Sequence, residues 1–330
     1  MDRTHTVALA LQGGGVHAAF AWGVLDRLLD RVAAGEVRLA AVSGAASGAL
    51  NAAALANGCR EGGAQGGPAT ARSRRVAEAA RAKLRELWET VARASFWGGN
   101  PLVAAMGMQT GWTIDSSPAA RWAEVAGAGL PGAGGGIGST LGAVLREVLP
   151  DAPAIFALPD PDAPTLVVAA TDVVEGRRQL FLDGAVSPEA LRASLCRPGT
   201  PDTVEIGGHH YWDGGSMGNP PLTCLVERLR QADAADLILV TTNPIHRDGP
   251  PRGTRAALDR LNELTFNAAL LHEVNTIETL NRLVDAGMVT APAAGQHAYR
   301  RVNLHRVAAD EEIARLGVYS KEAPAWDFLA

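Results

Sequence analysis

The sequence predicts an α/β fold in which helices flank a central, mainly parallel sheet. A short apolar run at residues 7–11 ends in three glycines, and apolar residues then recur at helical spacing up to Gly35. The same order of strand, glycine turn and helix begins again at residues 37–42. Apolar runs at residues 166–170 and 237–241 add further candidate strands. Repetition of this unit is typical of parallel α/β folds.

Two more helices follow the second glycine turn. An alanine-rich helix is expected to end at Gly58, and a loop rich in Gly, Ala and Pro over residues 59–71 leads to a helix over about residues 72–94. One side of this last helix is apolar and the other is strongly basic. The basic side would suit peripheral contact with an anionic membrane, but a solvated face with acidic partners is the preferred interpretation. Those partners are Glu78, Glu86 and Glu89.

The remaining regions are an internal insertion and a C-terminal extension. Residues 95–150 are rich in glycine and small residues, with scattered Trp and Met, and they predict either a lid over an apolar pocket or a plain surface excursion. Further along, a helix is expected over residues 254–285 and a strand over 299–307. We therefore expect a main domain at residues 1–250 and an extension at 251–330 packed on it.

Composition excludes several classes of function. The chain has 330 residues, of which 47% are hydrophobic and 20% charged, so it can bury a full core. Its formal net charge of −5 gives no basic footprint for a nucleic-acid partner. Cys59, Cys196 and Cys224 are widely spaced and are interpreted as buried thiols outside any disulfide or zinc site. No secretory leader or bilayer-spanning run is recognised, which favours a cytoplasmic location. The oligomeric state is left open.

Three short blocks carry the chemistry. Two are the glycine turns, Gly13-Gly14-Gly15 and the run from Gly44 to Gly48, each placed between a strand and a helix. Unpaired N–H groups and the helix dipole at such turns stabilise negative charge. The third block, Asp213-Gly214-Gly215, lies far downstream and is followed by Asn219-Pro220.

These blocks, in this order, resemble the patatin-like phospholipase family. Gly13, Gly14 and Gly15 match its oxyanion block, Gly44 through Gly48 its G-x-S-x-G elbow, and Asp213 its Asp-Gly-Gly block. The resemblance spans most of residues 7–244 and implies a three-layer α/β/α fold. It implies a phospholipase A-type esterase that uses no metal or cofactor and acts on a lipid or another acyl ester.

The resemblance also implies a role for each block. The elbow serine attacks the ester carbonyl, Asp213 accepts its proton, and the N–H groups of Gly13, Gly14, Gly15 and Ser47 form the oxyanion hole. Acyl transfer to another acceptor and thioester cleavage are alternatives on the same scaffold.

The third elbow position, where the nucleophile is expected, holds Ala46, which has no atom able to attack a carbonyl. Three explanations compete: an engineered Ser→Ala substitution that inactivates the enzyme, a natural pseudoenzyme that binds lipid or protein, and use of Ser47 as a displaced nucleophile. The first is preferred because every other part of the site is present. Ser47 is the weaker nucleophile because one step along a helix turns a side chain by about 100°.

A rival interpretation is a dinucleotide site, since Gly13, Gly15 and Ala18 fit the G-x-G-x-x-A fingerprint. The second strand, however, ends at Ser43-Gly44 without the carboxylate that a ribose needs. This interpretation is therefore the weaker one, and a lack of cofactor absorbance or binding would exclude it.

Other polar residues are given ordinary roles. His17 stands where many family members have a basic residue, and it either aids anion binding or starts the helix. His209 and His210 are adjacent and would point to opposite faces of a strand, so they are not expected to share a metal. Asp172 and Asp183 lack the pattern that surrounds Asp213 and are interpreted as turn residues.

Overall fold

The predicted parallel sheet forms around strand β1. Strand β1 pairs with β2 on one side and with β7 on the other. Strand β3 follows β2, and β8 follows β7, and all of these pairs are parallel. The strands are β1 (His5–Leu11), β2 (Val37–Ala45), β3 (Thr165–Asp172), β4 (Arg177–Leu182), β5 (Val204–Ile206), β6 (His209–Asp213), β7 (Asp236–Thr241) and β8 (Asn303–Ala308).

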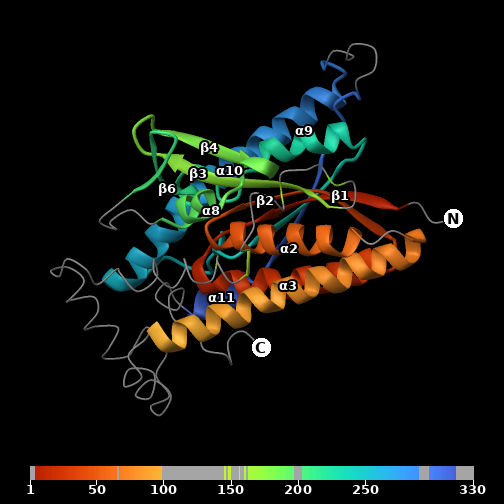
Figure 1. Cartoon of the computed structure of the whole chain (residues 1–330). Helices are drawn as coiled ribbons and strands as arrows, with labels where there is room; N and C mark the ends of the chain where they lie inside the picture. Colours follow the sequence, from red (N-terminus) through yellow and green to blue (C-terminus); the bar gives the residue numbers. More distant parts are fainter. Residues whose placement is uncertain are drawn as a thin grey trace.

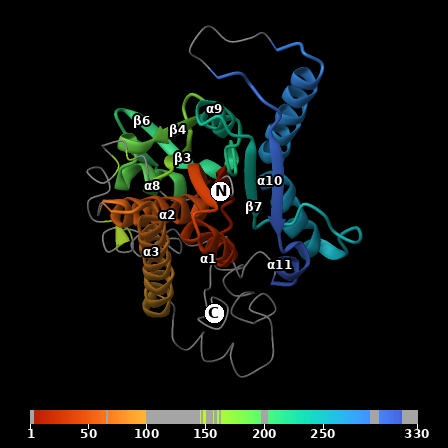
Figure 2. The same ribbon diagram turned by 90° about the vertical axis from the view of Figure 1, so that its right-hand side faces the viewer.

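Helices cover both faces of this sheet. Figure 1 shows α2 and α3 along one face and α9 and α10 along the other, and in Figure 2 α10 again lies across the sheet from them. This arrangement confirms the predicted α/β class. The helices are α1 (Ala19–Ala33), α2 (Ser47–Gly63), α3 (Ala69–Gly98), α8 (Pro188–Leu195), α9 (Thr223–Gln231), α10 (Gly253–Asp285) and α11 (Asp310–Leu316), with short 3-10 turns η1 (Gly15–Ala18), η3 (Asp183–Ala185) and η4 (Gly214–Ser216).

This computed structural model describes residues 4–64, 67–98, 145, 148, 149, 156, 160, 163–196, 203–289 and 297–316. The predicted lid or surface excursion at residues 95–150 falls almost entirely outside these ranges. The division into domains at residue 250 remains a prediction, although β8 joins the same sheet as β1. None of the described helices has the length and apolar character needed to cross a bilayer.

The two ends of strand β3 have different neighbours along one edge. Antiparallel β4 occupies the other edge of β3 over residues 167–172. On the edge opposite β4, β2 pairs with β3 as far as Ala169, and antiparallel β6 pairs with it from Ala170 onward. Strands β2 and β6 therefore meet end to end, which brings two distant parts of the sequence together at the carboxyl edge of the parallel strands.

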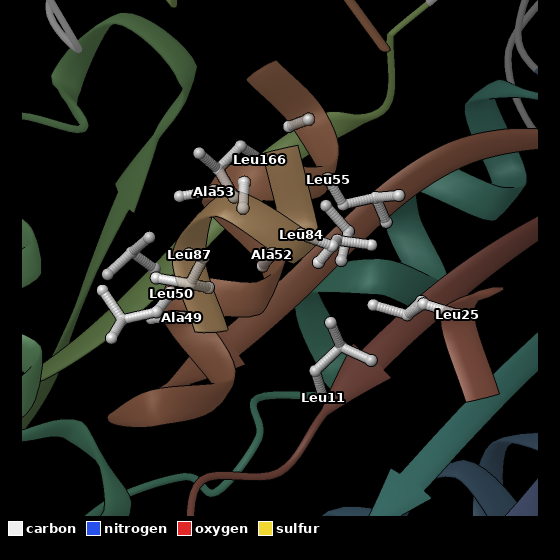
Figure 3. Packing of buried hydrophobic residues seen from close by; sticks show 14 of the residues in the cluster. Leu11, Leu25, Ala49, Leu50, Ala52, Ala53, Leu55, Leu84, Leu87 and Leu166 are labelled. Atoms are coloured by element: carbon white, nitrogen blue, oxygen red, sulfur yellow. The ribbon is translucent and has the colours of Figure 1, made fainter. Parts of the chain in front are cut away.

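Helix α2 continues past Gly58, so the predicted end at this residue is wrong. A Cβ atom at Gly58 would lie 2.4 Å from the Cα of Ala80 in α3, and one at Gly62 would lie 2.6 Å from the Cα of Val76. The glycines thus allow close helix packing instead of ending a helix. Figure 3 shows the resulting core, in which Leu55 of α2 and Leu84 of α3 are both buried.

The basic side of α3 finds acidic partners, mostly on other helices. Arg81 donates to Asp26 of α1 at 2.9 Å and also pairs with Asp30. Lys83 pairs with Glu61 of α2 at 3.3 Å and with Glu86 at 3.2 Å. Of the three partners predicted from helical spacing, Glu86 is thus observed. The acidic partners on α1 and α2 come from helix packing, which spacing within α3 cannot show.

Helix α10 buries polar residues and exposes leucines. Its bounds agree with the predicted residues 254–285, while strand β8 begins at Asn303, later than expected. The buried polar residues each bond to a neighbouring segment, as when Asn281 exchanges two hydrogen bonds with the backbone of Val302. Because such bonds satisfy buried polar groups, this face can bury polar residues beside the apolar Leu270 and Ile277. The buried polar residues are Glu263, Asn267, Glu273 and Asn281, and the exposed leucines are Leu258, Leu261, Leu264, Leu271 and Leu283.

Candidate active site

Ala46 occupies a sharp turn between β2 and α2. Its φ of 50° and ψ of −130° lie in a region that L residues rarely adopt, at a cost of about 1–3 kcal/mol. Glycines on both sides make the turn possible: a Cβ at Gly44 would lie 2.4 Å from the Gly48 carbonyl oxygen, and one at Gly48 2.1 Å from that of Leu11. A strained strand-to-helix turn of this kind is how a nucleophile elbow presents its side chain.

Asp213 lies beside this turn. Ala45 pairs with Ala169 and Asp213 pairs with Ala170, and both use the edge of β3 that β4 leaves open. Because consecutive Cα atoms are about 3.8 Å apart, the end of β2 and the end of β6 are immediate neighbours. The elbow position and the predicted base are thus brought together from segments 167 positions apart (213 − 46).

The end of helix α8 holds both of these positions. The buried Ser194 Oγ accepts a hydrogen bond from the Ala46 N–H at 2.9 Å. The Cys196 carbonyl accepts one from the Asp213 N–H at 2.6 Å. Asp213 is only 6% exposed, and its Oδ1 accepts from the Gly215 N–H at 2.6 Å. Cys196 therefore holds the backbone of Asp213, and Gly215 holds its carboxylate.

The glycine block follows β1 and faces the elbow. The Gly13 N–H donates to Asn219 Oδ1 at 2.7 Å, and the Gly14 N–H donates to Ser47 Oγ at 3.1 Å. Within the described part of the chain, the N–H groups of Gly15 and Ser47 donate to no protein acceptor. Both lie at helix N-termini, where such groups attract negative charge.

A cluster of buried amide side chains surrounds the glycine block and was not identified from the sequence. Gln12 Oε1 accepts from the backbone N–H groups of Thr242 at 2.8 Å and Asn243 at 2.9 Å. Gln12 Nε2 donates to Asn267 Oδ1 of α10 at 2.9 Å and to the Asn219 carbonyl at 3.2 Å. Polar residues just after a central parallel strand, as in Thr242-Asn243, are the signal that could have found this cluster.

The other acidic candidates have structural partners. Asp172 Oδ1 accepts from the N–H groups of Glu175 and Val174, and its Oδ2 bonds to His209 Nδ1 at 2.9 Å. The hydrogen bond from Glu175 is the main cause that lowers the pKa of Asp172 below its usual value. Asp183 Oδ1 accepts from the Leu166 N–H at 2.9 Å.

The histidines and cysteines also take separate positions. His210 bonds to Thr203 Oγ1 at 2.8 Å and so has a different partner from its neighbour His209, while His17 is buried in η1. Cys59 is buried, whereas Cys196 and Cys224 are only partly buried, which corrects the expectation of three buried thiols. Among the described residues, no group of three His, Cys, Asp or Glu side chains is arranged to hold a metal ion.

Comparison with known proteins adds an independent result. A family model described as "Patatin-like phospholipase" matches residues 9–226, more than half of the chain. Among solved structures, the chain is similar to the crystal structure of VipD from Legionella pneumophila, with 16% sequence identity and a TM-score of 0.36, over 99% of this chain and 67% of that one. No curated protein sequence matches the chain significantly.

Proposed function

The chain belongs to the patatin-like phospholipase family, a family of lipid acyl hydrolases, and on this basis we propose that it carries a Ser-Asp esterase site whose nucleophile position is held by Ala46. The backbone of Ala46 carries the proposal. A φ of 50° is unfavourable for alanine, and its methyl group has no use for this conformation. The strained turn is what a nucleophilic hydroxyl at this position would require.

In the proposed reaction, a serine hydroxyl at position 46 attacks the carbonyl carbon of a lipid ester while Asp213 accepts its proton. The N–H groups of Gly14, Gly15 and Ser47 then stabilise the oxyanion, whereas that of Gly13 is held by Asn219. As the oxyanion collapses, the ester C–O bond breaks and the alcohol leaves with the proton from Asp213. Water attacks the acyl-enzyme in the same manner and releases the fatty acid. The chain with Ala46 would bind the ester without cleaving it.

The decisive experiment compares the chain as given with Ala46→Ser. Both proteins are assayed on a panel of activated acyl esters, phospholipids and acyl thioesters, and the panel also tests cleavage of thioesters. We expect hydrolysis by Ala46→Ser only. If Ala46→Ser hydrolyses no member of the panel, the esterase proposal is wrong.

Two further variants test the base. Asp213→Asn in the Ala46→Ser protein is expected to abolish turnover without unfolding the protein, since the amide cannot accept the proton. Asp172→Asn is the matched control, because Asp172 is also a buried aspartate at this edge of the sheet but bonds elsewhere. Turnover that survives Asp213→Asn would remove Asp213 as the base.

The missing hydroxyl itself favours a second candidate, a natural binding protein that holds lipid in an inactive cleft. This protein would bind vesicles or a fatty-acyl ester with the same affinity whether position 46 is alanine or serine, and would hydrolyse neither. Calorimetric titration of both proteins with a slowly cleaved ester analogue separates the two candidates. Equal binding without turnover supports the binding protein.

A further inference from the structure

The carbonyl oxygen of Gly13 is the most heavily bonded acceptor in the amide cluster. It accepts from Asn243 Nδ2 at 2.9 Å, from Thr242 Oγ1 at 3.0 Å and from Asn219 Nδ2 at 3.3 Å. All three donor residues are almost completely buried, with at most 1% of each exposed. A carbonyl offers two lone pairs, so three donors leave it no freedom to turn.

The direction of this carbonyl determines the direction of the next N–H group. A trans peptide is planar, and its C=O and N–H bonds point to opposite sides of the chain. With the Gly13 carbonyl held toward the end of β7, the Gly14 N–H must point away from β7. It reaches Ser47 Oγ at the start of α2, beside the elbow.

The close approach of Thr242 explains why position 14 is glycine. A Cβ atom at Gly14 would lie 2.5 Å from Thr242 Oγ1 and would displace this side chain. Hydrogen bonds to a carbonyl also polarise the peptide to which it belongs, which makes its N–H a stronger donor. The same contacts therefore aim the Gly14 N–H and strengthen it.

We infer that Thr242 and Asn243 are positioning residues that hold the Gly13–Gly14 peptide in the one orientation that presents the Gly14 N–H to an oxyanion at the elbow. The inference rests on the proposed function and extends it to residues outside the three matched blocks. Neither side chain touches the reacting atoms. Each acts through the peptide that it holds.

The test uses the Ala46→Ser protein and an isosteric series at position 242. Thr242→Val removes the hydroxyl and keeps the shape, whereas Thr242→Ser keeps the hydroxyl. We expect Thr242→Val to lower kcat about tenfold, because one of three contacts on the carbonyl is lost, whereas removing an oxyanion donor outright costs about 100-fold or more. KM should not change, since the donor acts on the transition state. Asn243→Leu is expected to show the same pattern, and Thr242→Ser to retain kcat.

Thermal unfolding of each variant shows whether a loss of kcat comes from a misplaced Gly13–Gly14 peptide or from a destabilised fold. If Thr242→Val does not fold, Thr242→Cys replaces it, because the weak S–H donor should give a lower kcat than Thr242→Ser. Equal kcat across the folded variants, or a change in KM alone, would overturn the inference and leave the proposed esterase intact. If Ala46→Ser is itself inactive on every ester, the proposed function fails and the inference fails with it.

Discussion

The Ser47 hydroxyl oxygen accepts a hydrogen bond of 3.1 Å from the Gly14 N–H, so this side chain faces the glycine turn. A charged oxyanion is a stronger acceptor than a neutral hydroxyl and would displace it from this donor. We therefore expect Ser47→Ala, made in the Ala46→Ser protein, to retain hydrolysis of an activated acyl ester. Its kcat/KM measures the outcome directly.

The same substitution in the chain as given is the control, and it distinguishes the remaining explanation of Ala46. If Ser47 were a displaced nucleophile, the chain as given would hydrolyse the ester and Ser47→Ala would abolish this activity. We expect no activity in either protein. A burst of product from the chain as given would assign the nucleophile to Ser47.

Two helical glycines are expected to respond to alanine with opposite signs. Gly58→Ala places a Cβ 2.4 Å from the Cα of Ala80, and overpacking of this kind costs about 1–3 kcal/mol. Gly23→Ala in α1 is the matched control, because nothing lies within 4 Å of its added Cβ. There the better helix propensity of alanine should stabilise the protein by about 0.5–1 kcal/mol. Urea unfolding measures both changes, and equal signs would contradict the packing argument.

The local pattern of the sequence predicted the sheet and its glycine turns because these depend on neighbouring residues. It could not show that Gln12 bonds to Thr242, since that contact needs the parallel pairing of β1 with β7. It failed at Gly58 for a related reason, since a glycine inside a helix pattern has two meanings and only the approach of α3 distinguishes them. The turn that contains Ala46 could be predicted from the sequence, whereas the strained backbone of Ala46 could not.

Glu273 of α10 replaces a missing cap at the start of α9, whose own first residues supply no capping side chain. Its Oε2 accepts from the N–H groups of Leu222 at 2.6 Å and Thr223 at 2.7 Å, and its Oε1 pairs with Arg178. Glu273→Ala leaves these donors unsatisfied and is expected to cost about 2–4 kcal/mol in the free energy of unfolding.

Glu278→Ala is the matched control on the same helix, because Glu278 is exposed, and it should change the free energy of unfolding by less than about 0.5 kcal/mol. A similar loss in both variants would show that α10 responds to any lost carboxylate and would contradict the cap. Glu273→Gln should fall between them, since an amide oxygen still accepts from α9 but no longer pairs with Arg178 as a charge.

Acid should reveal the contribution of Glu227. Hydrogen bonds from Arg230, the main cause, and from Gln231 and Tyr299 lower the pKa of Glu227 from 4.5 to about 2. Because the folded-state pKa is the lower one, the stabilisation is fully present above about pH 5 and is lost as the pH falls toward 2. Glu227→Gln should therefore reduce the free energy of unfolding at pH 6 and have progressively less effect below pH 4.

The partner variant Arg230→Gln provides the control, since it removes the main cause of the lowered pKa. In a double-mutant cycle, the coupling between Glu227 and Arg230 should fall with decreasing pH and with added salt, because the Glu227 side chain is 38% exposed. Urea unfolding of the four proteins between pH 2.5 and 6, about the range set by the two pKa values, measures this coupling. A coupling that does not change with pH would mean that Glu227 stabilises the fold through packing and not through its charge.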